Sequence, residues 1–260
     1  SGLEVELMPP IALNDLIAAG IVGISVVIMV IAFLSSRKPA SEPFENSPAY
    51  DGIEALIHRT SEEGKGLLLG MGDGFSGHNS GLGDSVGVMI EQIVLSRSVF
   101  NDLPTRSFSG DGALACISQL VVHGAYKNAM ASELFRSDQS ELSGTNAVVW
   151  MAGLMPELAR KDNAGMILSG AMRPENVLIA DLAERKELPL VAATGSLGAQ
   201  AAFFASGSLM TLGEEYYLPS IGKVNQRTYQ TQAKTLNWLR IVLAVGLILA
   251  SFLKLSGVLP

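Results

Sequence analysis

Small and acidic residues directly follow short apolar runs in the middle of the chain. In an open parallel sheet, ligands bind outside the carboxyl ends of the strands, where helix N-termini offer free amides to anions. The pattern therefore predicts a site for a nucleotide or another phosphate-bearing small molecule. The candidate ligand-binding residues are Gly72, Asp73, Gly74, Ser109, Asp111, Thr194, Gly195 and Ser196.

A purely structural interpretation explains the same residues. Strand-to-helix turns need glycine for backbone freedom, and they need Asp or Ser as N-caps, in any α/β protein. No Walker lysine follows the first of these loops, and no G-x-G-x-x-G precedes an acidic residue by some 20 positions. Asp73 and Asp111 would repel phosphate unless a cation intervened. Together with Asp138 they form a second candidate, a magnesium site, although a capping role explains Asp111 equally well.

The sequence offers no constellation for nucleophilic or acid–base catalysis. His58, His78 and His123 are scattered, with no H-E-x-x-H and no paired spacing. We therefore assign no catalytic residue, no metal ligand and no cofactor, and we favour a protein that is not an enzyme.

The elements that position these residues alternate between apolar runs and helical periodicity. Such alternation predicts an α/β fold of the Rossmann-like class, with a mostly parallel sheet of about five strands and helices on both faces. The expected strands are Gly66–Leu69, Arg106–Ser109, Glu133–Arg136, Gly165–Leu168 and Leu190–Ala193.

Two hydrophobic segments flank this domain. Ile11 to Leu34 contains only Asn14, Asp15 and Ser25 as polar residues, and this segment is long enough to cross a bilayer as a helix. The second segment, from about Leu236 to Leu259, has a shorter uninterrupted core, so a buried amphipathic helix is its alternative. The expected organisation is an outer segment 1–10, a transmembrane helix 11–34, a linker 35–48, an α/β domain 49–222, a helical stalk 223–235 and a transmembrane helix 236–260.

Basic residues beside the two segments predict their orientation. Arg37 and Lys38 follow the first, and Trp238 and Arg240 mark the near interface of the second, with Lys254 as the only dissenting charge. We expect a two-pass protein of the inner cell membrane, with the central domain in the cytoplasm and both termini outside. A single cysteine, Cys116, fits a reducing compartment, and we expect it to be buried.

Two stretches near the end of the domain predict contacts between chains. A helix rich in small residues, including Gly198 and Ala202, suits close packing on a sheet or on a neighbouring subunit. Glu214, Glu215 and Tyr216 follow it, either as a polar contact with a neighbour or as an ordinary bend whose aromatic rings cover the edge of the core. A net charge of −7 argues against a nucleic-acid partner.

These C-terminal stretches carry a resemblance. From Val191 to Phe204, and on through Gly213-Glu214-Glu215-Tyr216-Tyr217, the chain resembles an uncharacterised family of bacterial and archaeal membrane proteins, defined by a domain of unknown function. The resemblance implies a prokaryotic origin and a membrane location, and it supplies no catalytic residues.

Two functional hypotheses follow. The first is a non-enzymatic, membrane-anchored subunit of an oligomeric or multi-protein assembly, whose partners are the lipid bilayer and copies of itself or other membrane proteins. The second is a membrane-tethered sensor or enzyme that binds a nucleotide-like ligand at the strand ends. Transport is disfavoured because two spans without buried charge make no pathway.

Overall fold

The computed structural model describes residues 20, 22–23, 25–27, 30–31, 47–72, 81–217, 236–246 and 248. The chain divides into two compact units, Ser1–Phe44 with Asn225–Pro260, and Glu45–Val224. The expected α/β domain at 49–222 falls within the second unit.

The second unit is built on a six-stranded parallel sheet in the order β3-β2-β1-β4-β5-β6. This confirms the predicted α/β class with a parallel sheet. The strand order reverses between β1 and β4, which is the topological switch point where doubly wound folds bind ligands. The strands are β1 (Gly66–Met71), β2 (Arg106–Ser109), β3 (Ser140–Leu142), β4 (Asn163–Ser169), β5 (Leu190–Ala193) and β6 (Leu209–Met210).

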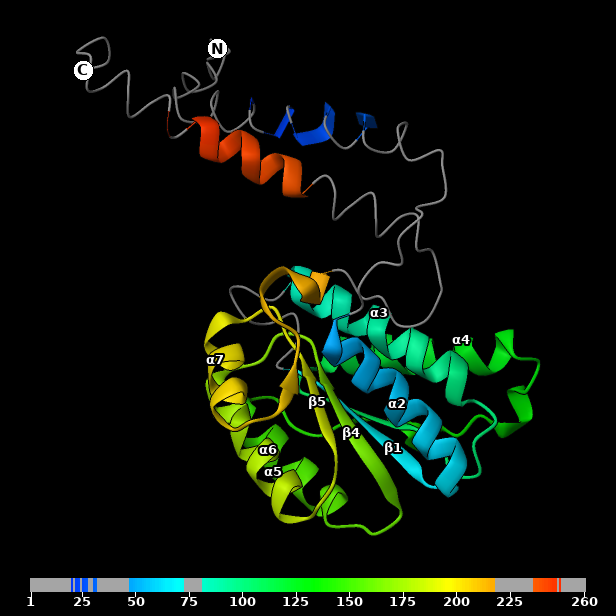
Figure 1. The fold of residues 1–260 in the computed structure, drawn as a ribbon. Coiled ribbons are helices and arrows are strands. Elements are labelled where there is room, and N and C mark those ends of the chain that lie inside the picture. The colour runs from blue at the N-terminus through cyan, green and yellow to red at the C-terminus, as the bar shows by residue number, and fades with distance from the viewer. Residues whose placement is uncertain are drawn as a thin grey trace, which may run out of the picture. The chain divides into compact units, whose positions relative to one another are not determined.

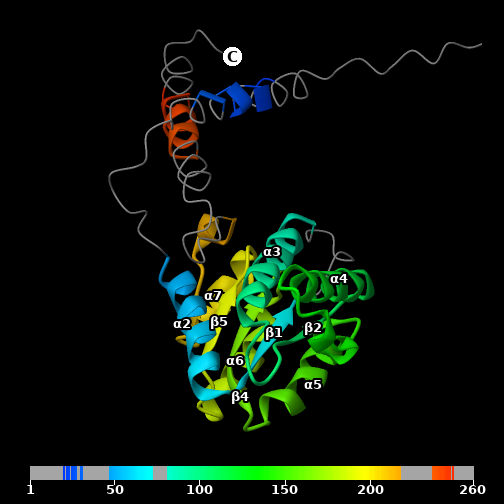
Figure 2. The same ribbon diagram turned by 90° about the vertical axis from the view of Figure 1, so that its right-hand side faces the viewer.

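Helices cover both faces of the sheet (Figures 1 and 2). One face carries α2 (Pro48–Glu63), α3 (Gly81–Ser98) and α4 (Gly112–Asn128), and the other carries α5 (Ala147–Leu158), α6 (Val177–Arg185) and α7 (Leu197–Ala205). Four short 3-10 helices complete the unit: η1 (Ser132–Leu134), η2 (Ser137–Gln139), η3 (Pro174–Asn176) and η4 (Gly213–Tyr217).

Burial on both faces explains the apolar central strands. Every residue of β1 and of β4 is buried. Because side chains alternate along a strand, Leu67 and Leu69 join the core beneath α2, α3 and α4, whereas Leu68 joins the core beneath α5, α6 and α7. Gly64 ends α2 in the left-handed conformation with φ +60°, which glycine adopts without strain.

The third strand was predicted in the wrong place. Residues 133–136 form no strand; η1 turns the chain there, and Phe135 packs edge-on against His123 and Tyr126 of α4. The strand that pairs with β2 comes later, at Ser140–Leu142. Phe135 therefore packs on α4 and does not contribute to the sheet.

Two smaller differences concern an extra strand and the cysteine. The sheet gains β6, whose two residues are too short to give an alternating pattern. Cys116 is exposed rather than buried, because the inward stripe of α4 passes through Leu114, Ser118 and Val122.

The terminal unit is described only in part. Residues 236–246 form a helix on which Trp238 and Arg240 are exposed, whereas Arg37, Lys38 and the expected stalk at 223–235 lie outside the described residues. Among the helices of the described residues, none has both the length and the apolar character that a membrane span requires.

Candidate functional site

The carboxyl edge of the sheet is closed by backbone hydrogen bonds between successive strand ends. The Gly72 amide donates to the Ser169 carbonyl oxygen at 3.0 Å, and the Gly110 amide donates to the Gly72 carbonyl oxygen at 3.2 Å. The Gly170 amide continues this pattern to the Ala193 carbonyl oxygen at 3.2 Å. The first residues after β1, β2 and β4 are therefore fixed against the neighbouring strand ends.

At the switch point, the loop after β4 packs directly on Gly72. A Cβ atom on Gly72 would lie 1.8 Å from the Ala171 carbonyl oxygen, so only glycine fits there. A Cβ on Gly87 of α3 would lie 2.9 Å from the Gly170 Cα, so α3 also approaches this loop closely. Glycine at Gly72 and Gly87 allows close backbone packing, whereas the structural interpretation of the sequence had assigned the turn glycines to backbone freedom.

Asp84 organises the switch point from the first turn of α3. Its side chain is fully buried, and its Oδ1 accepts a hydrogen bond from the Ala171 amide at 3.0 Å. The sequence analysis did not identify Asp84. Its signal was an acidic residue in a first helical turn after a glycine-rich loop, where a carboxylate complements the helix dipole.

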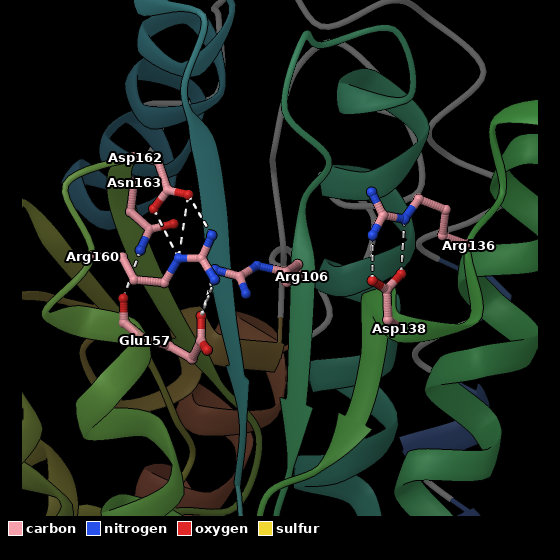
Figure 3. A network of polar contacts seen from close by, with 7 residues as sticks. All are labelled: Arg106, Arg136, Asp138, Glu157, Arg160, Asp162 and Asn163. Atoms are coloured by element: carbon pink, nitrogen blue, oxygen red, sulfur yellow. Dashed lines mark hydrogen bonds and ion pairs between the residues drawn. The ribbon is translucent and has the colours of Figure 1, made fainter.

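The three aspartates of the suggested magnesium site have separate surroundings. Asp111 is the N-cap of α4, and its Oδ1 accepts from the Ala113 and Leu114 amides at 2.9 and 3.2 Å. Asp138 forms a bidentate ion pair with Arg136 (Figure 3). This pair holds the pKa of the Asp138 carboxyl below its usual range. Asp73 lies outside the described residues, as does Gly74. The described ranges contain no group of three His, Cys, Asp or Glu side chains that could hold a metal ion.

The end of β5 is covered by the chain's own tyrosines. Thr194 is fully buried, and its Oγ1 accepts from the Ser196 amide while its carbonyl oxygen accepts from the Gln200 side chain. A Cβ on Gly195 would lie 2.5 Å from the Tyr217 hydroxyl oxygen and 3.1 Å from the Tyr216 ring. Here η4 occupies the space beside Gly195.

The η4 segment also holds the beginning of the domain. Glu215 Oε2 accepts from the Ser47 hydroxyl at 2.8 Å and from the Leu212 amide at 3.1 Å. The Tyr50 hydroxyl donates to the Tyr216 and Glu215 carbonyl oxygens at 2.8 and 3.1 Å. We call this set, Ser47, Tyr50, Glu215 and Tyr216, the terminal clamp.

The Tyr216 ring is fully buried inside its own domain. Burial raises the pKa of its hydroxyl, and the nearby Asp84 charge raises it further. Tyr216 therefore links the terminal clamp to the switch point. Among the other residues expected at an interface, Glu214 and Ala202 are half-buried, while Gly198 is exposed beside Pro174.

A buried polar cluster beneath α3 and α4 was not anticipated. Glu91 of α3 is fully buried, and its Oε1 accepts from the Ser118 hydroxyl at 2.5 Å. Ser118 in turn contacts Ser107 and Ser140. Burial raises the pKa of the Glu91 carboxyl, and hydrogen bonds from Ser107 and Ser118 only partly oppose this. An acid within an apolar helical stripe is the only sequence signal for such a group.

One polar atom at the carboxyl edge has no partner among the described residues. The Ser109 hydroxyl ends β2, is fully buried, and makes no hydrogen bond there. An unsatisfied buried hydroxyl is a position where a bound water or ligand group would be accepted. Of the expected ligand-binding residues that are described, Ser109 has a buried hydroxyl that keeps this capacity.

Comparisons with known proteins add no relatives. No protein-family model matches the chain, and neither a curated protein nor a solved structure matches it.

Proposed function

We propose that the chain is a membrane-anchored, non-enzymatic subunit of an oligomeric assembly. Its two hydrophobic terminal segments cross the inner membrane, its α/β domain lies in the cytoplasm, and its partners are copies of itself or other membrane proteins. The resemblance of its C-terminal part to a prokaryotic membrane-protein family supports the location. The hydrophobic segments and the basic residues beside them support the orientation.

The observation that carries the assembly role is the outer surface of α5 and α7. Both helices bury one side on the sheet, yet their outward sides are also apolar. On α7, Leu197 and Phe204 lie two turns apart and are 74% and 71% exposed. On α5, Val148 and Val149 are exposed as well. A helix that is apolar on all sides is normally covered on all sides, which a neighbouring subunit would achieve.

The terminal clamp supports the anchoring role. It holds the first and the last described residues of the α/β domain together at the carboxyl edge of the sheet. Two anchors that start at one point can enter one membrane without distorting the domain between them.

Mass measurement of the detergent-solubilised full chain tests the assembly. We expect a discrete oligomer that persists on dilution to micromolar concentration, because an apolar interface of standard size supports such an affinity. A monomer at high concentration would contradict the proposal. Membrane anchoring is tested separately: the protein should remain in the membrane after a carbonate wash, and protease added to intact cells should leave the domain uncut.

A nucleotide-like ligand remains the second candidate, favoured by the unsatisfied Ser109 hydroxyl at the end of β2. Its test is the melting temperature of the purified full chain with common nucleotides and magnesium. At 100 times its dissociation constant, a ligand stabilises the fold by about 2.7 kcal/mol. The shift should shrink in Ser109→Ala, and an unchanged melting temperature with every nucleotide would remove this candidate.

A further inference from the structure

A pocket with a concentration of basic side chains lies at the amino edge of the sheet, opposite the terminal clamp. Its volume is about 310 Å³. The residues that precede or begin β1, β4 and β5 form its floor, and the C-terminal ends of α2, α5 and α6 surround it. Five of its twelve lining residues are basic, Arg59, Lys65, Arg160, Lys161 and Lys186, and one, Glu187, is acidic.

This concentration contrasts with the chain as a whole, which carries a net charge of −7. Basic residues at the C-terminal ends of helices are common, because they complement the helix dipole. That role accounts for each residue separately. It does not account for the meeting of three helix ends around one pocket, which follows from the tertiary fold.

Neighbouring acids hold three of the five cations in place. Glu63 pairs with Arg59 and with Lys65, and both pairs lie at the end of α2. The Arg160 guanidinium forms an ion pair with Asp162 and lies near Glu157 (Figure 3). Glu157 in turn pairs with Arg106. These contacts fix the positions of the guanidinium and ammonium groups without removing them from the pocket.

Lys161 and Lys186 are different. Both are exposed, and neither side chain forms an ion pair or a hydrogen bond with any of the described residues. They are two ammonium groups on separate elements that line one pocket. Only Glu187 among the lining residues bears the opposite charge.

We propose that this pocket binds a small soluble polyanion that bears two or more phosphate or carboxylate groups. Lys161 and Lys186 would contribute the main charge-assisted contacts, with Arg59, Lys65 and Arg160 at the periphery. No aromatic side chain is among the described residues that line the pocket, so there is no stacking surface for a nucleobase. The site is separate from the switch point and from the outer faces of α5 and α7.

Calorimetric titration of the full chain in detergent with inorganic pyrophosphate tests the site. We expect saturable one-to-one binding per chain that weakens as sodium chloride is raised, since exposed charges are screened. Lys161→Ala and Lys186→Ala should each weaken binding by about ten-fold, because a hydrogen bond to a charged group contributes that much, and the double variant should abolish it.

Lys127→Ala is the matched control, because Lys127 is an exposed lysine in the last turn of α4 on another part of the domain. It should bind pyrophosphate as the unaltered protein does. Three results would overturn the proposal: no saturable heat with millimolar pyrophosphate, unchanged affinity in the double variant, or an equal loss in Lys127→Ala. The last would mean that general charge, and not the pocket, attracts the anion.

Discussion

The Ser47 hydroxyl donates a 2.8 Å hydrogen bond to the Glu215 carboxylate, across 168 residues of sequence. Beside it, Tyr50 bonds the backbone of the same 3-10 helix. The start and the end of the α/β domain are thus held together at the carboxyl edge of the sheet. In many doubly wound domains that edge is open to ligands; here part of it is used to join the domain's two ends.

Removal of the Tyr50 hydroxyl should weaken the terminal clamp. Tyr50→Phe leaves two buried carbonyl oxygens without their donor, which we expect to lower the free energy of unfolding by about 1–2 kcal/mol. Tyr217→Phe is the control, since the Tyr217 ring is 45% exposed. Urea unfolding of both variants measures the difference; equal stabilities would mean that the clamp contributes nothing.

Gly72 should tolerate no side chain. Gly72→Ala would place a methyl group against the Ala171 carbonyl oxygen, and we expect a loss of about 3 kcal/mol because the backbone of both loops must shift. Gly124→Ala meets no atom within 4 Å and lies inside α4, so it should gain about 0.5–1 kcal/mol. Thermal unfolding of the pair is the measurement. A mild effect at Gly72 would show that the strand-end loops are not tightly packed.

Asp111 can be tested as a cap. Asp111→Ala removes the acceptor for two amides at the start of α4 and should cost about 1 kcal/mol. Asp111→Asn keeps an oxygen acceptor and should retain most of the stability, because Asn caps helices about as well as Asp does. If Asn proved as damaging as Ala in urea unfolding, the negative charge itself would be required, and a cation or ligand role would return.

The Glu91 carboxyl should make stability fall as pH rises. Burial raises its pKa above the ordinary value of 4.5, so the folded state holds this proton more tightly than the unfolded state does. Below pH 4.5 the Glu91 carboxyl is protonated in both the folded and the unfolded state, so it gives the free energy of unfolding no pH dependence there. The free energy of unfolding then decreases as pH rises toward the folded-state pKa, because folding must keep an acid protonated that the unfolded chain would release.

Glu91→Gln should abolish this contribution. The amide is always neutral and can still accept from Ser118, so we expect the variant to gain stability relative to the unaltered protein as pH rises from 5 to 8. Urea unfolding across this range is the measurement, and Glu133→Gln, an exposed position, is the control. Parallel pH profiles for Glu91→Gln and the unaltered protein would contradict the argument.

The proposed assembly surface has its own test. Leu197→Ser and Phe204→Ser should shift the oligomer toward smaller species in mass measurements while changing the free energy of unfolding of the separated subunit by only about 0.5 kcal/mol, because both side chains are exposed. Leu120→Ser is the matched control: Leu120 is 72% exposed on α4, across the sheet. Dissociation by the control as well would argue against a specific surface.

The sequence determined the fold class and most of the elements. Arg106–Ser109 and Leu190–Ala193 are strands with the predicted bounds. Leu190–Ala193 is apolar throughout, as a strand buried on both faces normally is, whereas Phe108 is the only apolar residue of Arg106–Ser109. The end of α2 at Gly64 is also a local feature, since a glycine directly after a helical stripe favours the left-handed conformation that ends a helix. Local chemistry also offered the capping role of Asp111 as one of its alternatives.

Only the tertiary structure decided which residues meet. Asp84 and Tyr216 come together at the switch point although 132 positions separate them, and Ser47 meets Glu215 because the chain returns to one edge of the sheet. The third strand was predicted at the wrong residues because Phe135 packs against His123 and Tyr126 of α4 instead of joining the sheet. Hydrophobic periodicity shows which face of a helix or strand is buried. The residues that this face contacts depend on the tertiary fold, and a local sequence pattern does not specify them.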